Sequence, residues 1–296
     1  MKILIIGCGL TGKAITFNLL KNSKVECIGL YSRTLKSSKA LADKLKNSRI
    51  KILENLETIK EYDYIIMTLS GISDSSREES FFKSKTTYEI RQMELKYNLG
   101  ALVGLIDYLK NISSISTIIV VTNPMDEITN YLRIILKNNK VIGFGLDLDA
   151  RRYSKLLDKS VYCIGSHGKA IPLIKLSSEK EYKSLYEKTD SELMIYLKKN
   201  GIPADVAGEI FSSFFNKLTG DKEEIIHVSA YLKKEFEGIK SISISLPYRV
   251  KQGKILGVAK ITLNSIEKKI FIKSIKELKK SINHILITHN KLAKYK

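Results

Sequence analysis

Four polar side chains in the middle of the chain have types that suit acid–base chemistry on a small acid. Glycines bracket the Ser166-His167 pair, and a histidine that titrates near neutral pH can donate a proton to a reacting oxygen. Asp149 and Arg152 are spaced to share one face of a helix, and a planar guanidinium binds a carboxylate through two hydrogen bonds. Asn123 follows an apolar run and is placed to bind a substrate oxygen. The types indicate proton transfer beside a bound carboxylate; a structural histidine, a surface ion pair and an Asn-Pro turn are the alternatives.

A glycine-rich segment near the N-terminus has the spacing of a nucleotide-binding turn. It follows an apolar run at residues 2–7 and opens a segment of helical period. In that context the first glycine allows a tight turn, the second lets backbone amides approach a pyrophosphate, and the third lets helix and strand pack closely. A glycine turn without a ligand is the alternative. The residues expected to contact the cofactor here are Gly7, Gly9, Leu10, Thr11 and Gly12.

The residues after the second predicted strand bear on which cofactor binds. A carboxylate there would accept from the ribose 2′-hydroxyl of NAD, but the chain has Ser32, Arg33 and Thr34. A guanidinium beside hydroxyl groups suits a 2′-phosphate, so the sequence favours NADP. NAD is the alternative, in which Arg33 only faces solvent. Further cofactor contacts are expected at Leu69, Ser70 and Asn123.

The first half of the chain alternates short apolar runs with amphipathic helical segments. This pattern predicts βαβ crossovers and an α/β fold with a Rossmann doubly wound parallel sheet. The second half predicts a mixed α+β substrate domain, and we set the boundary between residues 1–144 and 145–296. The predicted strands are 2–7, 25–31, 49–53, 63–69, 117–122, 241–247 and 255–262, and the clearest predicted helices are 182–199, 204–218 and a tail from 265 towards 291.

Residues 70–88 form the longest segment without a clear periodic pattern. The segment is polar and rich in serine. A loop of this length in a compact domain is usually a functional lid or is disordered. We therefore expect a lid or a disordered segment between residues 70 and 88.

Composition narrows the class of protein. The 296 residues carry a net charge of +19, but the lysines are spread over most predicted helices, so a basic surface is favoured over a nucleic-acid partner. No apolar run is long enough to span a membrane, and the apolar N-terminal run is too short for a signal peptide. Cys8, Cys27 and Cys163 are odd in number and lack metal-ligand spacing, which indicates reduced thiols in the cytoplasm and no bound metal.

Three segments together carry a family resemblance. They are residues 118–126, which include Asn123-Pro124-Met125-Asp126, residues 143–153, which include Asp149 and Arg152, and residues 165–172, which include His167. In this order after the glycine motif they resemble the strand-end, arginine-helix and histidine-loop segments of the lactate/malate dehydrogenase family, and the likeness continues through residues 241–258 and the final helix. The resemblance implies a Rossmann fold, a nicotinamide cofactor, a 2-oxo acid or L-2-hydroxy acid substrate and a homodimer or homotetramer.

The resemblance also implies roles for individual residues. His167 would be the acid/base, Asp149 would orient it, Arg152 would bind the substrate carboxylate and Asn123 would assist at the substrate oxygen. The family carries a further arginine on a mobile loop, seven residues before an asparagine; Arg91 fits this spacing through Asn98, with Arg77 as a weaker competitor.

Departures from the family pattern bear on the substrate. Ser166 and Lys169 replace the usual glutamate and aspartate, the stretch from Asp149 to His167 is shorter than usual, and the stretch from Ser70 to Arg91 is longer, closer to the extended loop of the L-2-hydroxyisocaproate dehydrogenase branch. Substrate choice is expected at Lys85, Pro203, Ala204 and Ala207.

These positions leave the substrate open. Small groups opposite the loop leave room for a lactate-like or bulkier apolar 2-oxo acid, whereas a cationic Lys85 would suit oxaloacetate, which makes malate dehydrogenase the alternative. A catalytically silent NAD(P)-binding regulator is a further alternative from another class. A glycosidase is discouraged by the order of the motifs.

Overall fold

A parallel sheet forms the first half of the protein. The computed structural model describes residues 1–112, 115–138 and 140–293. The strands run in the order β3-β2-β1-β4-β5-β6, which is the Rossmann order, with parallel pairing throughout. The expected doubly wound sheet is therefore confirmed. The strands are β1 (Lys2–Ile6), β2 (Cys27–Tyr31), β3 (Ile50–Ile52), β4 (Tyr64–Met67), β5 (Thr117–Val120) and β6 (Val141–Gly143).

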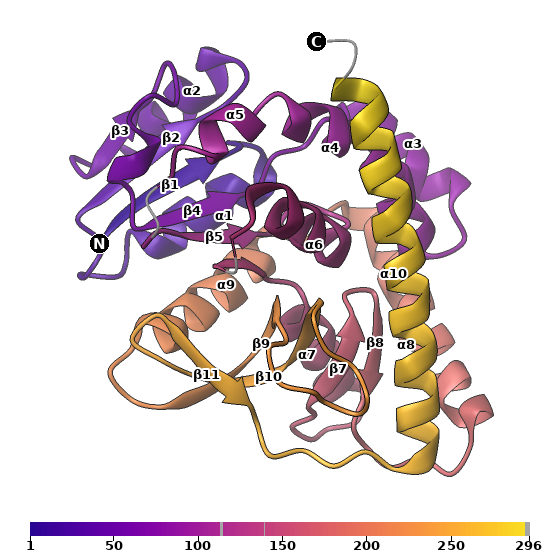
Figure 1. Ribbon diagram of the computed structural model, residues 1–296. Coiled ribbons are helices and arrows are strands. Elements are labelled where there is room, and N and C mark those ends of the chain that lie inside the picture. The colour runs from indigo at the N-terminus through magenta and orange to yellow at the C-terminus, as the bar shows by residue number, and fades with distance from the viewer. Residues whose placement is uncertain (113–114, 139, 294–296) are drawn as a thin grey trace.

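Helices cover both faces of this sheet (Figure 1). Successive residues of β1 enter different cores: Ile3 and Ile5 belong to one apolar cluster, Leu4 and Ile6 to the other. A strand buried on both faces needs apolar residues at every position, which explains the unbroken apolar runs of the sequence. The helices of this half are α1 (Leu10–Leu19), α2 (Leu35–Leu45), the short 3-10 helix η1 (Ile59–Glu61), α3 (Asp74–Lys83), α4 (Thr87–Val103), α5 (Ile106–Leu109) and α6 (Met125–Leu136).

The second half continues the same sheet with antiparallel strands. β6 pairs with β9 at Gly143 and Ser229, and the order then runs β9-β10-β7-β8, with β11 on β10. The expected mixed α+β part is therefore observed. Its elements are α7 (Leu146–Leu156), β7 (Cys163–Ser166), β8 (Lys169–Pro172), α8 (Glu179–Asn200), α9 (Ala204–Thr219), β9 (Glu224–Tyr231), β10 (Ser243–Lys251), β11 (Lys254–Val258) and α10 (Ser265–Ala293).

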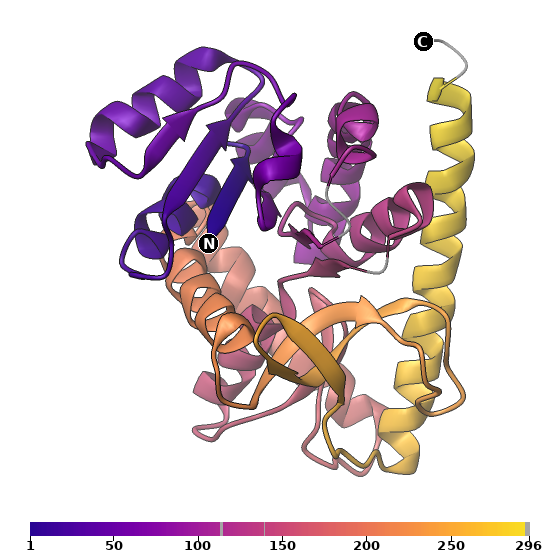
Figure 2. The same ribbon diagram turned by 60° about the vertical axis from the view of Figure 1, so that its left-hand side comes forward.

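Two long helices connect the halves. α9 packs against α1, and Gly208 lies so close to Ala14 that a side chain there would meet its backbone. α10 runs the height of the molecule along one side, beside β7 and β8 below and α4 and α6 above (Figure 1; Figure 2). The cleft between the halves is thus bounded by helices from both.

The expectation of a loop or disorder over residues 70–88 is wrong for most of its length. Residues Asp74–Lys83 form α3, whose first turn is capped by the Ser73 hydroxyl accepting from the Ser76 amide. The Thr86 hydroxyl caps α4 in the same way, and the Glu89 carboxylate accepts from the Lys85 amide. Hydroxyl side chains that make the segment look like a loop therefore cap the first turns of two helices.

Candidate active site

The glycine segment forms a turn between β1 and α1 that faces the cleft. Gly7 has φ 111°, a conformation that favours glycine, and the space next to Gly12 is filled by the Gly7 carbonyl. Gly9, by contrast, has open space where a side chain would lie. It is the N-cap of α1 and no side chain caps the helix, so the first amides of α1 are left for a ligand. This arrangement fits a pyrophosphate.

His167, in the turn after β7, and Asp149, in α7, form a close pair. The Nδ1 atom of His167 lies 2.6 Å from the Oδ2 atom of Asp149, and the other carboxylate oxygen accepts from the Nη1 atom of Arg152 at 2.8 Å. The Gly168 amide also donates to Asp149, at 3.0 Å. The short spacing from Asp149 to His167 therefore still allows direct contact, because β7 begins soon after α7 ends.

Arg91 approaches His167 from the opposite side. Its Nη2 atom is 3.3 Å from the His167 Nε2 atom, and its Nη1 atom donates to the Thr87 hydroxyl at 3.0 Å. Gly168 lies directly against this guanidinium and has φ 86°, so a side chain at Gly168 would displace Arg91. Arg77 does not make this contact; it pairs with Glu94 at 3.2 Å.

Two buried polar atoms at the site have no partner within the described part of the chain: the Nε atom of Arg91 and the Oδ1 atom of Asn123. Buried polar groups are nearly always hydrogen-bonded, so both atoms indicate a place for a polar ligand. Asn98, seven residues after Arg91, donates to the Asn123 carbonyl at 2.6 Å and accepts from the Gly71 amide at 2.7 Å. It holds the strand end that carries Asn123.

Burial and charge set opposite protonation states for the two members of the pair. Burial lowers the pKa of His167, and the positive charges of Arg91 and Arg152 lower it further. The negative charge of Asp149 raises it, but the pKa remains below that of an ordinary histidine. For Asp149, burial alone would raise the pKa, but His167, Arg152 and Arg91 together hold it well below its usual range. A neutral imidazole beside an ionised carboxylate is the resting state that follows.

A cavity of about 440 Å³ joins the glycine turn to this pair. Most of the predicted residues border it, but Gly7, Gly12 and Asp149 lie behind its lining. Lys85 is also outside the cavity, because its side chain is exposed on the turn between α3 and α4. Ser32, Arg33 and Thr34 lie beyond the cavity at the end of β2, where Gly7 donates to the Tyr31 carbonyl. The predicted residues that line the cavity are Gly9, Leu10, Thr11, Leu69, Ser70, Arg91, Asn123, Arg152, His167, Pro203 and Ala207.

Sequence reasoning missed several groups near the site. Asp126 accepts from the His167 amide at 2.7 Å and from the Ser245 hydroxyl at 2.6 Å, and it stands in the Asn-Pro-Met-Asp segment that was already singled out. Arg151 and Lys155 line the cavity beside Arg152, and their helical spacing on α7 was the available signal. Lys169 points away, to Glu277 and the Tyr88 ring.

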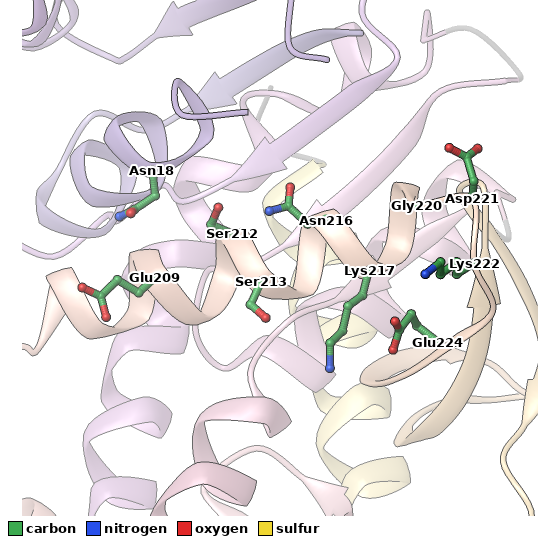
Figure 3. A pocket seen from close by; sticks show the side chains of 10 residues that line it. All are labelled: Asn18, Glu209, Ser212, Ser213, Asn216, Lys217, Gly220, Asp221, Lys222 and Glu224. Carbon is green, nitrogen blue, oxygen red and sulfur yellow. The ribbon is translucent and has the colours of Figure 1, made fainter. Parts of the chain in front are cut away.

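A second hollow lies on another part of the surface. It measures about 700 Å³ and is lined by polar side chains of α9, the end of α1 and the turn before β9 (Figure 3). Its lining residues include none of the glycine turn and none of His167, Asp149, Arg91 and Arg152. Among the described residues, no group of three or more His, Cys, Asp or Glu side chains could hold a metal ion, and no described helix meets the length and hydropathy needed to cross a membrane.

Comparisons with known proteins find dehydrogenases over part or nearly all of the chain. Residues 1–91 match the model of the shikimate/quinate 5-dehydrogenase family, a match that ends before Asn123, Asp149 and His167. The chain is 28% identical to an L-2-hydroxycarboxylate dehydrogenase (NAD(P)(+)) of Methanocaldococcus jannaschii, over 95% of this chain and 97% of the relative.

Two solved structures share the fold over nearly the full length. A malate dehydrogenase of Archaeoglobus fulgidus in complex with NADH has a TM-score of 0.77 at 22% identity, covering 96% of this chain and 99% of the other. An L-lactate dehydrogenase of Clostridium thermocellum has a TM-score of 0.74 at 21% identity, covering 96% and 98%.

The fold and the comparisons thus define a nicotinamide-dependent oxidoreductase. Within that class, the relatives and structural neighbours are L-2-hydroxycarboxylate, malate and lactate dehydrogenases, which supports the expected resemblance to the lactate/malate dehydrogenase family. The match to the shikimate/quinate model covers the glycine turn, the strands β1 to β4 and the helices up to the start of α4, and most of this region is the nucleotide-binding part that many enzymes share.

Proposed function

We propose that the protein reduces a 2-oxo acid to the L-2-hydroxy acid with NADPH, or with NADH as the alternative. The observation that carries this is the contact of His167 with Asp149 on one side and Arg91 on the other, at the inner end of a cavity that starts at the glycine turn. The relative from Methanocaldococcus jannaschii carries a matching name. A bound nicotinamide supplies the hydride.

In this proposal His167 donates the proton from Nε2 to the substrate oxygen as that oxygen gains negative charge. Asp149, held ionised, stabilises the imidazolium form and fixes the ring through Nδ1. Arg91 polarises the carbonyl from beside Nε2, and Asn123 assists there by donating from its side-chain Nδ2 group, while its unpartnered Oδ1 can accept from the hydroxyl of the product. Arg152 holds the substrate carboxylate while Asp149 holds Arg152.

The side chain of the substrate is proposed to be apolar and bulkier than a methyl group. The support is the apolar wall of the same cavity, built from α3, α4, α8 and the loop before α9, while Lys85 stays outside. Malate/oxaloacetate is the second candidate, since Arg77, Arg151 and Lys155 line the cavity and could bind a second carboxylate. The apolar wall consists of Phe81, Ile90, Leu193, Leu197 and Ile202.

NADP is proposed because Arg33 and Thr34 are exposed at the end of β2, with no carboxylate at Ser32. Ser32 donates to the Thr34 carbonyl at 2.8 Å, which shapes the turn before α2 and leaves the Arg33 side chain outward.

We also propose a cytoplasmic homodimer or homotetramer with a nucleotide domain ending near residue 144, as the family resemblance implies; light scattering in solution tests the oligomer.

One assay tests the proposed function. NADPH and NADH oxidation are compared with 2-oxoisocaproate, pyruvate and oxaloacetate, using the wild type, His167→Asn and, as control, His284→Asn on the exposed face of α10. We expect turnover with NADPH, a loss of at least about a hundredfold in His167→Asn and none in the control. If both nucleotides bind but neither is oxidised with any acid, the protein is a silent regulator and the proposal fails.

A further inference from the structure

A second imidazole–carboxylate pair lies behind the site. The Nδ1 atom of His227 in β9 is 2.6 Å from the Oδ1 atom of Asp147, which also accepts from the His227 amide at 3.3 Å. Both side chains are largely buried, at 9% and 20% exposure. The pair does not border the cavity, so it has no direct part in binding.

The other ring nitrogen of His227 replaces a missing strand contact. The Cys163 amide of β7 donates to His227 Nε2 at 3.1 Å. β10 lies between these strands, and its register, with Ser245 opposite Gly165, sets Pro247 opposite Cys163. The Pro247 carbonyl, which could accept from the Cys163 amide, accepts instead from the Ala259 amide at 2.9 Å, and among the described residues the strand register joins β10 to β7 only at Ser245. The His227 ring therefore reaches across to anchor the start of β7.

These two contacts hold the elements that carry the reacting pair. Asp147 lies in the first turn of α7, two residues before Asp149, and Cys163 opens β7, four residues before His167. We propose that His227 is a positioning residue, which fixes α7 against β7 and thereby keeps Asp149 and His167 in contact. This inference rests on the proposed role of His167 as proton donor.

The hydrogen bonds assign one form of the ring. Because Nε2 accepts from an amide, Nδ1 must carry the hydrogen that is donated to Asp147, so His227 is neutral. A proton on Nε2 would place two hydrogen-bond donors, the ring N–H and the Cys163 amide, against each other and remove this hydrogen bond. The titratable groups around the ring are Asp147 from α7, the Cys163 thiol from β7 and Tyr162, whose ring centre is 5.7 Å away; β10 contributes Pro247.

The kinetic test uses variants on both sides of the bridge. His227→Phe keeps a ring but removes both hydrogen bonds, and Asp147→Ala removes the anchor on α7 at a partly exposed position that tolerates the loss more easily. We expect both to lower kcat roughly tenfold while the KM for NADPH changes by less than about twofold, because the glycine turn is untouched. His227→Gln, which can both donate and accept, should recover part of the loss; His284→Phe is the matched control.

A measurement without turnover keeps the test independent of the proposed function. Long-range ¹H–¹⁵N spectra resolve the chain's four histidines, assigned by single substitutions. We expect His227 as the neutral Nδ1–H tautomer and, in His227→Phe and Asp147→Ala, a His167 titration moved towards that of an ordinary histidine.

The spectra and the kinetics together distinguish a positioning role of His227 from a packing role. If the His167 resonances and kcat are unchanged in both variants, His227 only packs the interior and the inference is wrong. If His227→Phe does not fold, Asp147→Ala carries the same comparison. If the wild type turns over no 2-oxo acid, the proposed function has failed, while the spectra still report whether His227 positions His167.

Discussion

At His167 the backbone and the ring are held by two different carboxylates. Asp126 accepts from the backbone amide and Asp149 from the ring. With both fixed, only Nε2 faces the cavity, where Arg91 meets it. His167 can therefore transfer a proton to a substrate only through Nε2. The pH dependence of activity should then follow the pKa of His167.

The pH dependence of reduction follows from that direction. Reduction needs protonated His167, and burial, only partly opposed by Asp149, lowers its pKa. We expect kcat/KM for the 2-oxo acid to fall with rising pH above an apparent pKa lower than the ordinary value of about 6.5. Oxidation of the hydroxy acid, which needs the neutral ring, should rise through the same range.

Initial rates across the pH range in both directions provide the measurement. An apparent pKa above that of an ordinary histidine would contradict a buried donor between two arginines. The enzyme–substrate complex is followed separately through kcat, because substrate charge adds to the electrostatics there.

Residues inside contiguous motifs could be predicted from the sequence, since neighbouring letters fix their local frame. His167, Asp149 and Arg152 come together as expected. Lys85 was proposed by counting six residues back from Arg91. The count crosses the start of α4, where the chain changes direction in a way that the sequence does not predict. The Lys85 side chain is exposed outside the cavity. Its role in substrate choice stays a prediction.

At the scale of elements, α3 shows where local pattern is insufficient. Its sequence is almost wholly polar, and its main apolar contact is Phe81, which packs with Ile90 of α4 and Met194 of α8. α8 follows about a hundred residues later in the chain, so a window of local sequence could not reveal the contact. Tertiary packing, together with the Ser73 cap, makes this segment a helix.

Glu127 joins three helices and makes their packing depend on pH. It lies in α6 and accepts from Gln92 of α4 and Ser281 of α10, at 3.3 and 3.4 Å. Burial, with help from the Asp126 charge, raises its pKa to about 7. The folded protein therefore keeps a proton that the unfolded chain releases at lower pH, and stability from this group is lost as pH rises from the ordinary value towards 7.

Glu127→Gln should remove this loss, because glutamine accepts the same two hydrogen bonds without a charge. We expect the variant to be more stable than the wild type at about pH 8, by up to about 3 kcal/mol, and similar to it near pH 5. Urea unfolding at the two pH values gives the free energies. A variant less stable at both would mean that the carboxylate is stabilised by its surroundings after all.

At the scale of the whole molecule, the excess of lysine and arginine gives the protein a strong positive charge. The chain carries a net charge of +19, and the cavity is lined by Arg77, Arg91, Arg151, Arg152 and Lys155 against the single carboxylate of Glu94. A field of one sign at a cleft attracts anions and raises their rate of encounter. Both proposed ligands, a 2-oxo acid and a dinucleotide, are anions.

Salt should therefore slow the reaction at low substrate concentration. Raising ionic strength from about 20 to about 200 mM is expected to lower kcat/KM several-fold with little change in kcat. The double variant Arg151→Glu, Lys155→Glu should show a weaker dependence, and Lys279→Glu, Lys280→Glu on α10 is the control with the same change of charge. Equal salt sensitivity in the two double variants would assign the effect to net charge instead of to the cavity.

The parallel half of the sheet could be predicted because each βαβ unit is local in sequence. Its continuation could not: β9 joins β6 through Gly143 and Ser229, a pairing between distant segments that no periodic pattern encodes. The expected boundary at residue 144 coincides with the change from parallel to antiparallel pairing, and it stays a prediction for how the halves fold.

The position of α10 has a consequence for genetics. None of the residues proposed for chemistry lies beyond Ala207, yet the last helix supplies Glu277 to Lys169 and Ser281 to Glu127, and packs beside β7 and α4. A premature stop codon shortly before Ser265 would leave every one of those residues encoded while removing the helix that spans both halves. In a complementation screen, truncating alleles in this stretch should behave as nulls, whereas single missense changes on its exposed face should pass unnoticed.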